Sequence, residues 1–333
     1  MKKTFLTAAT VVAGLVAVAQ PAATDTVPTV ALSEVEVLGT RASASTPVAF
    51  TNLTGKQLAA ENHGLDIPFL LTMTPSVITT SDAGAGVGYT SMRVRGTDAT
   101  RINITVNDIP MNDAESHSIY WVNTPDFASS VRDIQVQRGA GTSTNGSGAF
   151  GGSVNMRTQG FSRDPYAEVS GSYGSYNTNK ETLRVGTGLL GDHWAIESRL
   201  SHIGSDGYRD RASSELLSYF GQLGYFNAGT SLRFITFGGK EDTYHAWDGI
   251  SRDDLKERRT YNPNGEIKHD GQVTGFYKDQ KDIYRQTHYQ LIWNRRLIPC
   301  GNSMLRCTIP TASATTRSTR TPVRSRSTVC CPW

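Results

Sequence analysis

The chain has 333 residues, of which 38% are hydrophobic and 19% charged, a composition typical of a folded protein rather than a disordered one. Its formal net charge is +3, but this positive value comes from five arginines after residue 297. Subtracting them from +3 leaves −2 for residues 1–297, and leaving out Lys2 and Lys3 as well gives −4. The body of the chain is therefore acidic, which argues against nucleic acid as a partner.

The N-terminus predicts export. Lys2 and Lys3 precede an apolar run that ends at the small-residue step Ala17-Val18-Ala19. Because this run is too short to cross about 30 Å of hydrocarbon, we expect residues 1–19 to be a signal peptide that is cleaved near Ala19. No later stretch approaches the roughly 20 apolar residues of a membrane helix, so any membrane crossing would use tilted strands.

Residues 20–44 are rich in Thr, Ala and Pro, which predicts an extended, flexible segment. Within this segment lies a short β-prone run of five residues: Glu34, Val35, Glu36, Val37 and Leu38. Such a run near a free end can add as a strand to the sheet edge of another protein. It could equally be the first strand of the domain that follows.

Residues 45–158 predict a mixed α/β domain. Thr54 and Gln57 have capping-box spacing at the start of a short helix, and Asp66 is expected to cap a second helix over residues 67–73. Short strands separated by glycine-rich loops are expected over 92–95, 102–106, 134–137 and 153–157. The glycines between residues 146 and 151 have the spacing of a dinucleotide fingerprint, but a strand follows them instead of a helix, so no nucleotide cofactor is expected.

Residues 159–297 predict a series of antiparallel strands in which apolar and polar residues alternate. The expected strands are Ala167–Tyr173, Trp194–Leu200, Leu216–Phe226, Ser231–Phe237 and Gln286–Trp293. Tight turns at 190–192 and 227–229 alternate with long connections over 203–214 and 242–282, as in outer-membrane barrels. A soluble sandwich would alternate too, but aromatic residues near the strand ends favour six to seven strands of a membrane barrel.

Residues 298–333 differ from the rest of the chain. They hold all four cysteines but no Tyr, Phe, Asp, Glu or Lys. The cysteine spacing matches no zinc site. Reading the codons of this segment in a shifted frame gives an alternating strand followed by an aromatic loop, like the segments before it. We therefore expect an out-of-frame or disordered tail. DNA sequencing around codons 294–305 would test this interpretation.

Three motifs resemble those of the TonB-dependent receptors: Met92-Arg-Val-Arg95-Gly96, Val106-Asn-Asp-Ile-Pro110, and Ile134-Gln-Val-Gln-Arg138-Gly139 continued by Gly148-Ala-Phe-Gly151-Gly152-Ser-Val154-Asn155. The similarity covers about Glu34 to Leu297. Departures include Ala140-Gly141, where the family usually has Pro after Arg-Gly, and Asn107-Asp108 in place of Asp-Gly.

The resemblance implies an α+β plug domain followed by antiparallel transmembrane β-barrel strands, as an incomplete 22-stranded barrel. It implies that residues 34–38 are the TonB box, which couples the receptor to TonB and its inner-membrane energising complex. It also implies that Arg95 and Arg138 contact glutamates on later barrel strands. We therefore expect that the chain as written, with few strands, forms no functional pore and leaves both arginines without those partners.

The expected function is TonB-dependent active transport of a small-molecule metal chelate across the outer membrane, in contact with outer-membrane lipid. Aromatic rings and arginine suit an anionic iron–siderophore complex, although each residue could instead pack against the barrel wall. The candidate contacts are Tyr89, Arg101, His117, Tyr120 and Trp121. We expect no enzyme activity, metal site or cofactor. The alternatives are an exported β-rich surface binding or adhesion protein without transport, or a non-functional fragment of a receptor for vitamin B12 or another nutrient.

Overall fold

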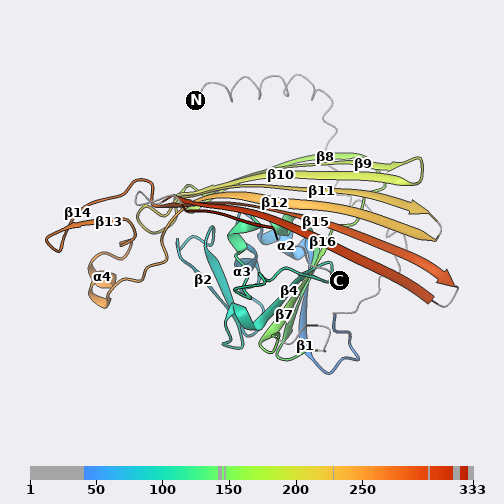
Figure 1. Cartoon of the computed structure of the whole chain (residues 1–333), viewed down its shortest axis with the longest axis horizontal. Coiled ribbons are helices and arrows are strands. Elements are labelled where there is room, and N and C mark those ends of the chain that lie inside the picture. The colour runs from blue at the N-terminus through green and yellow to red at the C-terminus, as the bar shows by residue number, and fades with distance from the viewer. Residues whose placement is uncertain are drawn as a thin grey trace, which may run out of the picture.

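The structure is a computed structural model that describes residues 41–141, 145, 148–227, 229–298, 301–317 and 323–328, with side chains described up to Arg295. An open sheet of eight strands covers one face of a smaller α+β domain (Figure 1). Within the described residues, no helix has the length and apolar character needed to span a membrane. The expected signal peptide (1–19) and the β-prone run (34–38) lie outside the described residues.

The α+β domain contains a mixed five-stranded sheet in the order β1-β6-β7-β4-β5 and a separate hairpin of β2 and β3. In this sheet β4 and β7 run parallel. The elements are β1 (Ala49–Thr54), α2 (Gly55–Glu61), α3 (Ile67–Leu70), β2 (Val77–Ser81), β3 (Thr90–Val94), η2 (Ala99–Arg101), β4 (Ile102–Val106), β5 (Ile109–Pro110), η3 (Trp121–Asn123), η4 (Phe127–Ser130), β6 (Val131–Arg138) and β7 (Gly152–Thr158).

The two predicted helix starts have different outcomes. The capping box at α2 is confirmed, because the Thr54 side chain accepts from the Gln57 backbone and the Gln57 side chain accepts from the Thr54 backbone. The prediction for Asp66 is wrong: its side chain makes no cap, and the helix is the single turn α3. Asp66 is buried and instead accepts from Thr90 Oγ1 at 2.8 Å, so a tertiary partner replaces the local cap.

The eight-stranded sheet is antiparallel throughout, in the order β17-β16-β15-β12-β11-β10-β9-β8. Its strands are β8 (Tyr166–Tyr173), β9 (Asn179–Leu190), β10 (Trp194–Ser205), β11 (Ser214–Asn227), β12 (Thr230–Tyr244), β15 (Lys281–Ile298), β16 (Gly301–Arg317) and β17 (Val323–Thr328). The strands β16 and β17 fall in the tail expected to be out of frame or disordered; the pairing of their backbones does not test the reading frame.

Short turns lie at one end of this sheet and long connections at the other. The β12–β15 connection contains α4 (Arg252–Glu257), β13 (Glu266–His269) and β14 (Gln272–Phe276), which project beyond the end of the sheet (Figure 1). The structure also contains η6 (Ser175–Asn177) between β8 and β9. We refer to the end that carries the long β12–β15 connection as the mouth.

The two faces of the sheet have opposite character. The face away from the α+β domain exposes apolar side chains, among them Trp194, Ile196, Leu200, Phe234 and Trp293. The face toward the domain buries polar ones, among them Glu197, Arg199, Gln222, Arg233 and Gln290. This alternation is the pattern of a strand with lipid on one side and a polar interior on the other.

An apolar contact joins the domain to the middle of the sheet. Phe220, Ile235, Phe237 and Ile292 of the sheet enter the same buried cluster as the core of the α+β domain. The rings of Phe127 and Phe237 lie 4.8 Å apart. A smaller apolar cluster joins Val87 and Val122 of the domain to Ile203 and Leu216 of the sheet.

The buried carboxyl of Asp66 predicts a pH-dependent stability. Burial raises its pKa to about 7, although Thr90 and Gly88 partly oppose the shift. The pKa of this carboxyl is higher in the folded chain than in the unfolded chain, where it is near 3.8. The contribution of Asp66 to the free energy of unfolding is therefore complete below pH 3.8 and is lost as the pH rises through 7. Urea unfolding of the full chain in detergent should therefore show less stability at pH 8 than at pH 4. Asp66→Asn should reduce this difference by up to about 4 kcal/mol, at about 1.4 kcal/mol per pKa unit.

Asp253, an exposed residue in the first turn of α4, provides the matched control, and Asp253→Asn should leave the pH profile unchanged. An Asp66→Asn variant with the same pH profile as the unmodified chain would contradict the prediction.

Candidate functional site

A buried carboxylate, Asp126, lies where the α+β domain meets strands β9 and β10. It precedes the 3₁₀ turn η4 and adopts a left-handed conformation with φ of 49°. The next residue, Phe127, enters the core. The turn thus buries its aromatic ring in the domain and directs the neighbouring carboxylate to the sheet.

Two cations and two hydroxyl groups of the sheet surround Asp126. Lys180 Nζ lies 2.7 Å from Oδ1, and Arg199 Nη1 lies 2.8 Å from Oδ2. Ser201 Oγ donates to Oδ2 at 2.6 Å, and Thr182 Oγ1 donates to it at 3.2 Å. All these side chains project from the inner face of β9 or β10, so one carboxylate connects two strands to the domain.

This group of Asp126, Lys180 and Arg199 is almost completely removed from solvent, with side-chain exposures of 0%, 7% and 3%. Burial alone would raise the pKa of Asp126, but the charges of Arg199 and Lys180 outweigh burial and lower it. Removing one member of a buried ion pair leaves an uncompensated charge, which costs far more than the pair itself contributes. The group therefore fixes one position of the domain against the sheet, and we call it the ionic seat.

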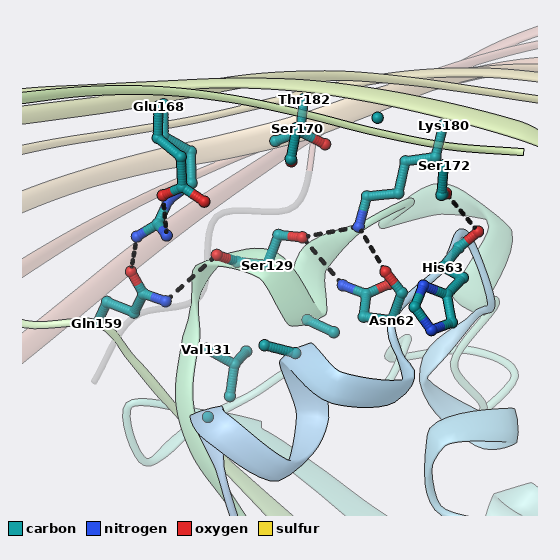
Figure 2. Close-up of a pocket in the computed structure, with 15 residues that line it drawn as sticks. Asn62, His63, Ser129, Val131, Gln159, Glu168, Ser170, Ser172, Lys180 and Thr182 are labelled. Atoms are coloured by element: carbon teal, nitrogen blue, oxygen red, sulfur yellow. Dashed lines mark hydrogen bonds and ion pairs between the residues drawn. The ribbon is translucent and has the colours of Figure 1, made fainter. Parts of the chain in front are cut away.

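A cavity of about 250 Å³ lies beside the ionic seat, between α2 and strands β8 and β9. In Figure 2 Lys180 reaches from its strand toward Ser129 and Asn62, and Ser172 points to His63. Lys180 Nζ lies 3.0 Å from Ser129 Oγ and 3.2 Å from the Asn62 carbonyl oxygen. The polar lining of this cavity suits water, which would make the contact easier to separate than a packed apolar one.

A second polar cluster lies where the α+β domain leads into β8. Arg233 of β12 donates to Thr158 Oγ1 at 3.1 Å, to the Gln159 carbonyl at 3.1 Å and to Gln222 Oε1 at 2.9 Å. Nearby, Asn107 Nδ2 donates to Gln290 Oε1 of β15 at 3.0 Å. Hydrogen bonds therefore hold the C-terminal end of the α+β domain to the same inner face that carries the ionic seat.

The predicted contact residues Arg95 and Arg138 lie elsewhere. Arg95 is exposed, with φ of 52°, and its guanidinium lies over Gly139. Arg138 donates to Thr51 Oγ1 of β1 at 2.8 Å, inside its own domain. Neither makes an ion pair with a described residue of the sheet, so their proposed glutamate partners stay a prediction.

Sequence reasoning missed Asp126, Lys180 and Arg199. A signal was present, because Arg199 lies on the polar face of a predicted strand, and an inward charge next to a folded domain needs a partner. The partner itself lies 73 positions away in the chain. Only the packing of the domain on the sheet identifies it.

The predicted substrate contacts lie in four different places. Tyr89 and Tyr120 are near the mouth, where Tyr89 Oη donates to Asp282 Oδ2 at 2.5 Å and Tyr120 is half exposed. His117 is exposed in the turn that follows Asp113. Arg101 is exposed and lies over the Phe150 ring at 5.4 Å, whereas Trp121 is buried in the core. The five residues therefore form no single cluster, and Trp121 contributes to packing.

Within the described residues, no group of three or more His, Cys, Asp or Glu side chains is arranged to hold a metal ion. The predicted TonB box, residues 34–38, lies outside the described residues.

Residues 42–153 match the family described as TonB-dependent Receptor Plug Domain. A search of curated proteins found no match. The comparisons indicate no catalytic family.

Several solved structures have a similar fold. The siderophore receptor PirA from Acinetobacter baumannii is 16% identical with a TM-score of 0.59, over 80% of this chain and 40% of that one. The ferric citrate transporter FecA is 16% identical with a TM-score of 0.62, over 81% and 41%. The ferric-catecholate import receptor Fiu from E. coli is 17% identical with a TM-score of 0.60, over 81% and 39%. This chain spans about two fifths of the length of each. The predicted fold, a plug followed by antiparallel barrel strands, is confirmed.

The ionic seat predicts that Asp126→Asn weakens the contact between the domain and the sheet. The substitution keeps the shape but leaves Lys180 and Arg199 buried without their counter-charge, which should cost about 3–5 kcal/mol. Hydrogen exchange of the full chain in detergent should become faster at residues 126–130 and along β9 and β10.

A matched control is Asp133→Asn, because Asp133 pairs with Arg41 and Arg157 inside the α+β domain. That variant should leave exchange along β9 and β10 unchanged. Unchanged exchange there in Asp126→Asn would show that the carboxylate does not hold the domain in place.

Proposed function

Because this chain carries the plug domain of the TonB-dependent receptors and has their fold over the strands that follow, we propose that it serves TonB-dependent active transport across the outer membrane, with the plug gating the barrel. The observation that carries the proposal is the ionic seat beside a polar cavity. Such a contact fixes one position of the plug while it is formed, and water can hydrate its polar groups when the plug moves.

We assign the remaining segments on the same basis. Residues 1–19 act as the signal peptide, residues 20–44 lie in the periplasm, the plug covers 45–158 and the first barrel strands follow over 159–297. Glu34–Leu38 is the TonB box, which pairs with TonB as an added strand and so connects the receptor to the inner-membrane energising complex. Force on this segment would act on the plug, whose first described strand is β1.

The proposed substrate is a small-molecule metal chelate, an iron–siderophore complex. Support comes from the structural neighbours, which are a siderophore receptor, a ferric citrate transporter and a ferric-catecholate import receptor. It also comes from the aromatic residues Tyr89 and Tyr120 near the mouth. We propose that Arg95 and Arg138 contact glutamates on barrel strands beyond those described.

The TonB box can be tested by binding, independently of transport. Deleting residues 34–38 should abolish binding of the purified chain to the isolated periplasmic domain of TonB. Val35→Pro should weaken it at least about tenfold, because proline cannot donate a backbone hydrogen bond to the added strand. Val30→Pro, in the same segment but outside the box, is the matched control and should bind normally.

In a receptor that carries these segments in a complete barrel, the same deletion should abolish uptake of an iron-labelled chelate by cells that depend on it. Binding to TonB that survives the deletion would instead favour an exported surface protein without energised transport.

A further inference from the structure

A row of large residues, mostly aromatic, crosses the face of the sheet that points away from the plug, which we call its outer face (Figure 1). At the end with the short turns, Trp194 lies opposite Tyr225, and the two rings are 4.8 Å apart. Tyr225 in turn lies opposite Leu232, and Leu232 lies opposite Trp293. Aromatic rows of this kind lie at the boundary between lipid and water in membrane barrels. This row therefore marks one boundary of the apolar band.

Two cations lie near the other boundary of this band, toward the mouth. Lys240 of β12 lies directly opposite Arg285 of β15, eight residues before Trp293. Eight residues at about 3.3 Å each span about 26 Å along the strand, or about 20 Å across a membrane at a tilt of about 40°. The apolar band of such barrels is about 25 Å tall, its long loops are extracellular, and cationic side chains extend toward its edge. Both cations therefore reach the depth of outer-leaflet headgroups.

These two cations, which we call the basic pair, face each other without a counter-charge. Both side chains are exposed, and neither makes a hydrogen bond or an ion pair within the part of the chain that the structure describes. Like charges directly opposite in an antiparallel pair destabilise the sheet, because their Cβ atoms are only about 5 Å apart. An anion bound between Lys240 and Arg285 would remove this repulsion.

The nearest described acids of the outer face already have partners. Asp242, the next outer-face position of β12, has its Oδ1 2.9 Å from Lys281 Nζ. His202 lies between two glutamates, with Nε2 2.8 Å from Glu215 Oε2 and Nδ1 3.0 Å from Glu181 Oε2. The counter-charge for the basic pair must therefore come from outside these residues.

A groove of about 560 Å³ crosses the outer face beside the basic pair. Lys240 and Arg285 line it on β12 and β15. Apolar side chains of β8 to β11 line the rest, and four of them are exposed: Val169, Leu183, Leu200 and Leu217. The groove thus joins a positive end to an apolar floor.

Tyr219 gives this groove a fixed wall. Gly238 lies opposite both Tyr219 and Thr287 in the strand register, and Tyr219 Oη donates to Thr287 Oγ1 at 3.0 Å. The tyrosine thus reaches across β12 at a residue that has no side chain. Its hydroxyl is held at β15, which leaves the apolar surface of the ring to the groove that it lines.

The combination fits an amphiphile with a negative headgroup. Arginine binds phosphate through two parallel N–H bonds, and lysine adds a compact point charge. An acyl chain matches the leucines beside them, whereas a small soluble anion would leave these leucines uncovered.

We propose that the groove binds a lipid of the outer leaflet, with a phosphate-monoester headgroup between Lys240 and Arg285 and an acyl chain along Leu200 and Leu183. The proposal goes beyond the proposed transport function. It requires that the sheet lies in a membrane, but it does not require that the chain transports a ligand.

The test compares two lipids that differ only in the phosphate. The full chain in dodecylmaltoside is titrated with dioleoyl phosphatidic acid and with dioleoylglycerol, and native mass spectrometry measures the bound lipid. Phosphatidic acid should bind at least about tenfold more tightly, and increasing salt should reduce the difference. Equal affinity for the two lipids, or binding of neither, would overturn the proposal.

Inorganic phosphate distinguishes a lipid site from a simple anion site. An excess of it should displace no more phosphatidic acid than chloride does at the same ionic strength, because inorganic phosphate makes no contact with the apolar floor. Displacement by inorganic phosphate alone would show an anion site and would contradict the assignment of a lipid.

Variants locate the effect. The double variant Lys240→Gln/Arg285→Gln should lose most of the preference for phosphatidic acid. Lys256→Gln/Arg259→Gln is the matched control, because it changes the net charge equally at exposed residues in and after α4 that lie outside the groove. The ratio of the two affinities is taken within each variant, so partial loss of folded protein does not alter it.

A preference that persists without the basic pair, or that is lost equally in the control, would contradict the site. Deleting residues 34–38 should leave lipid binding unchanged. The lipid site and the transport proposal can therefore fail separately.

Discussion

One buried carboxylate between two buried cations determines how the two parts of the molecule fit together. Asp126 can reach Lys180 and Arg199 only because its left-handed conformation turns the chain between the core residue Phe127 and the sheet. In turn, β9 and β10 can carry inward cations only because the plug supplies the counter-charge. Removing one of these charges while the two halves stay packed would leave the others buried without compensation, so the ionic seat couples the fold of the plug to its position.

The polar inner face explains why an ionic contact is needed here. The sheet exposes apolar side chains on its outer face and directs polar ones inward, so the plug meets Glu197, Gln222, Arg233 and Gln290. Two apolar patches interrupt this polar contact, one around Phe237 and one where Val87 packs with Ile203 and Leu216. A plug held by a continuous apolar core could not separate without exposing that core to water, whereas these groups exchange protein partners for water at low net cost.

Much of this fold was predictable, because it rests on local patterns. The strand at 102–106 was predicted with its observed bounds, and the alternation in β10 and β11 identified which face is apolar. The β9 strand was missed, since its glycines interrupt the alternation. Asp66 had the spacing of a helix cap but forms a hydrogen bond with Thr90, 24 positions away. Asp126 had no local signal at all: its role depends on the packing of the plug on the sheet.

The polarity of the ionic seat is the reverse of the contact implied by the family resemblance. That resemblance places cations on the plug, at Arg95 and Arg138, and acids on the strands. In the ionic seat the acid lies on the plug and the cations lie on the described strands. The two arrangements are compatible because they involve different residues of the plug. The sheet covers one face of the plug (Figure 1), and Arg95 and Arg138 make no ion pair with its described residues. Glutamates opposite those arginines on further strands would add complementary charges of the opposite sense, and the two sets together would define a single orientation of the plug.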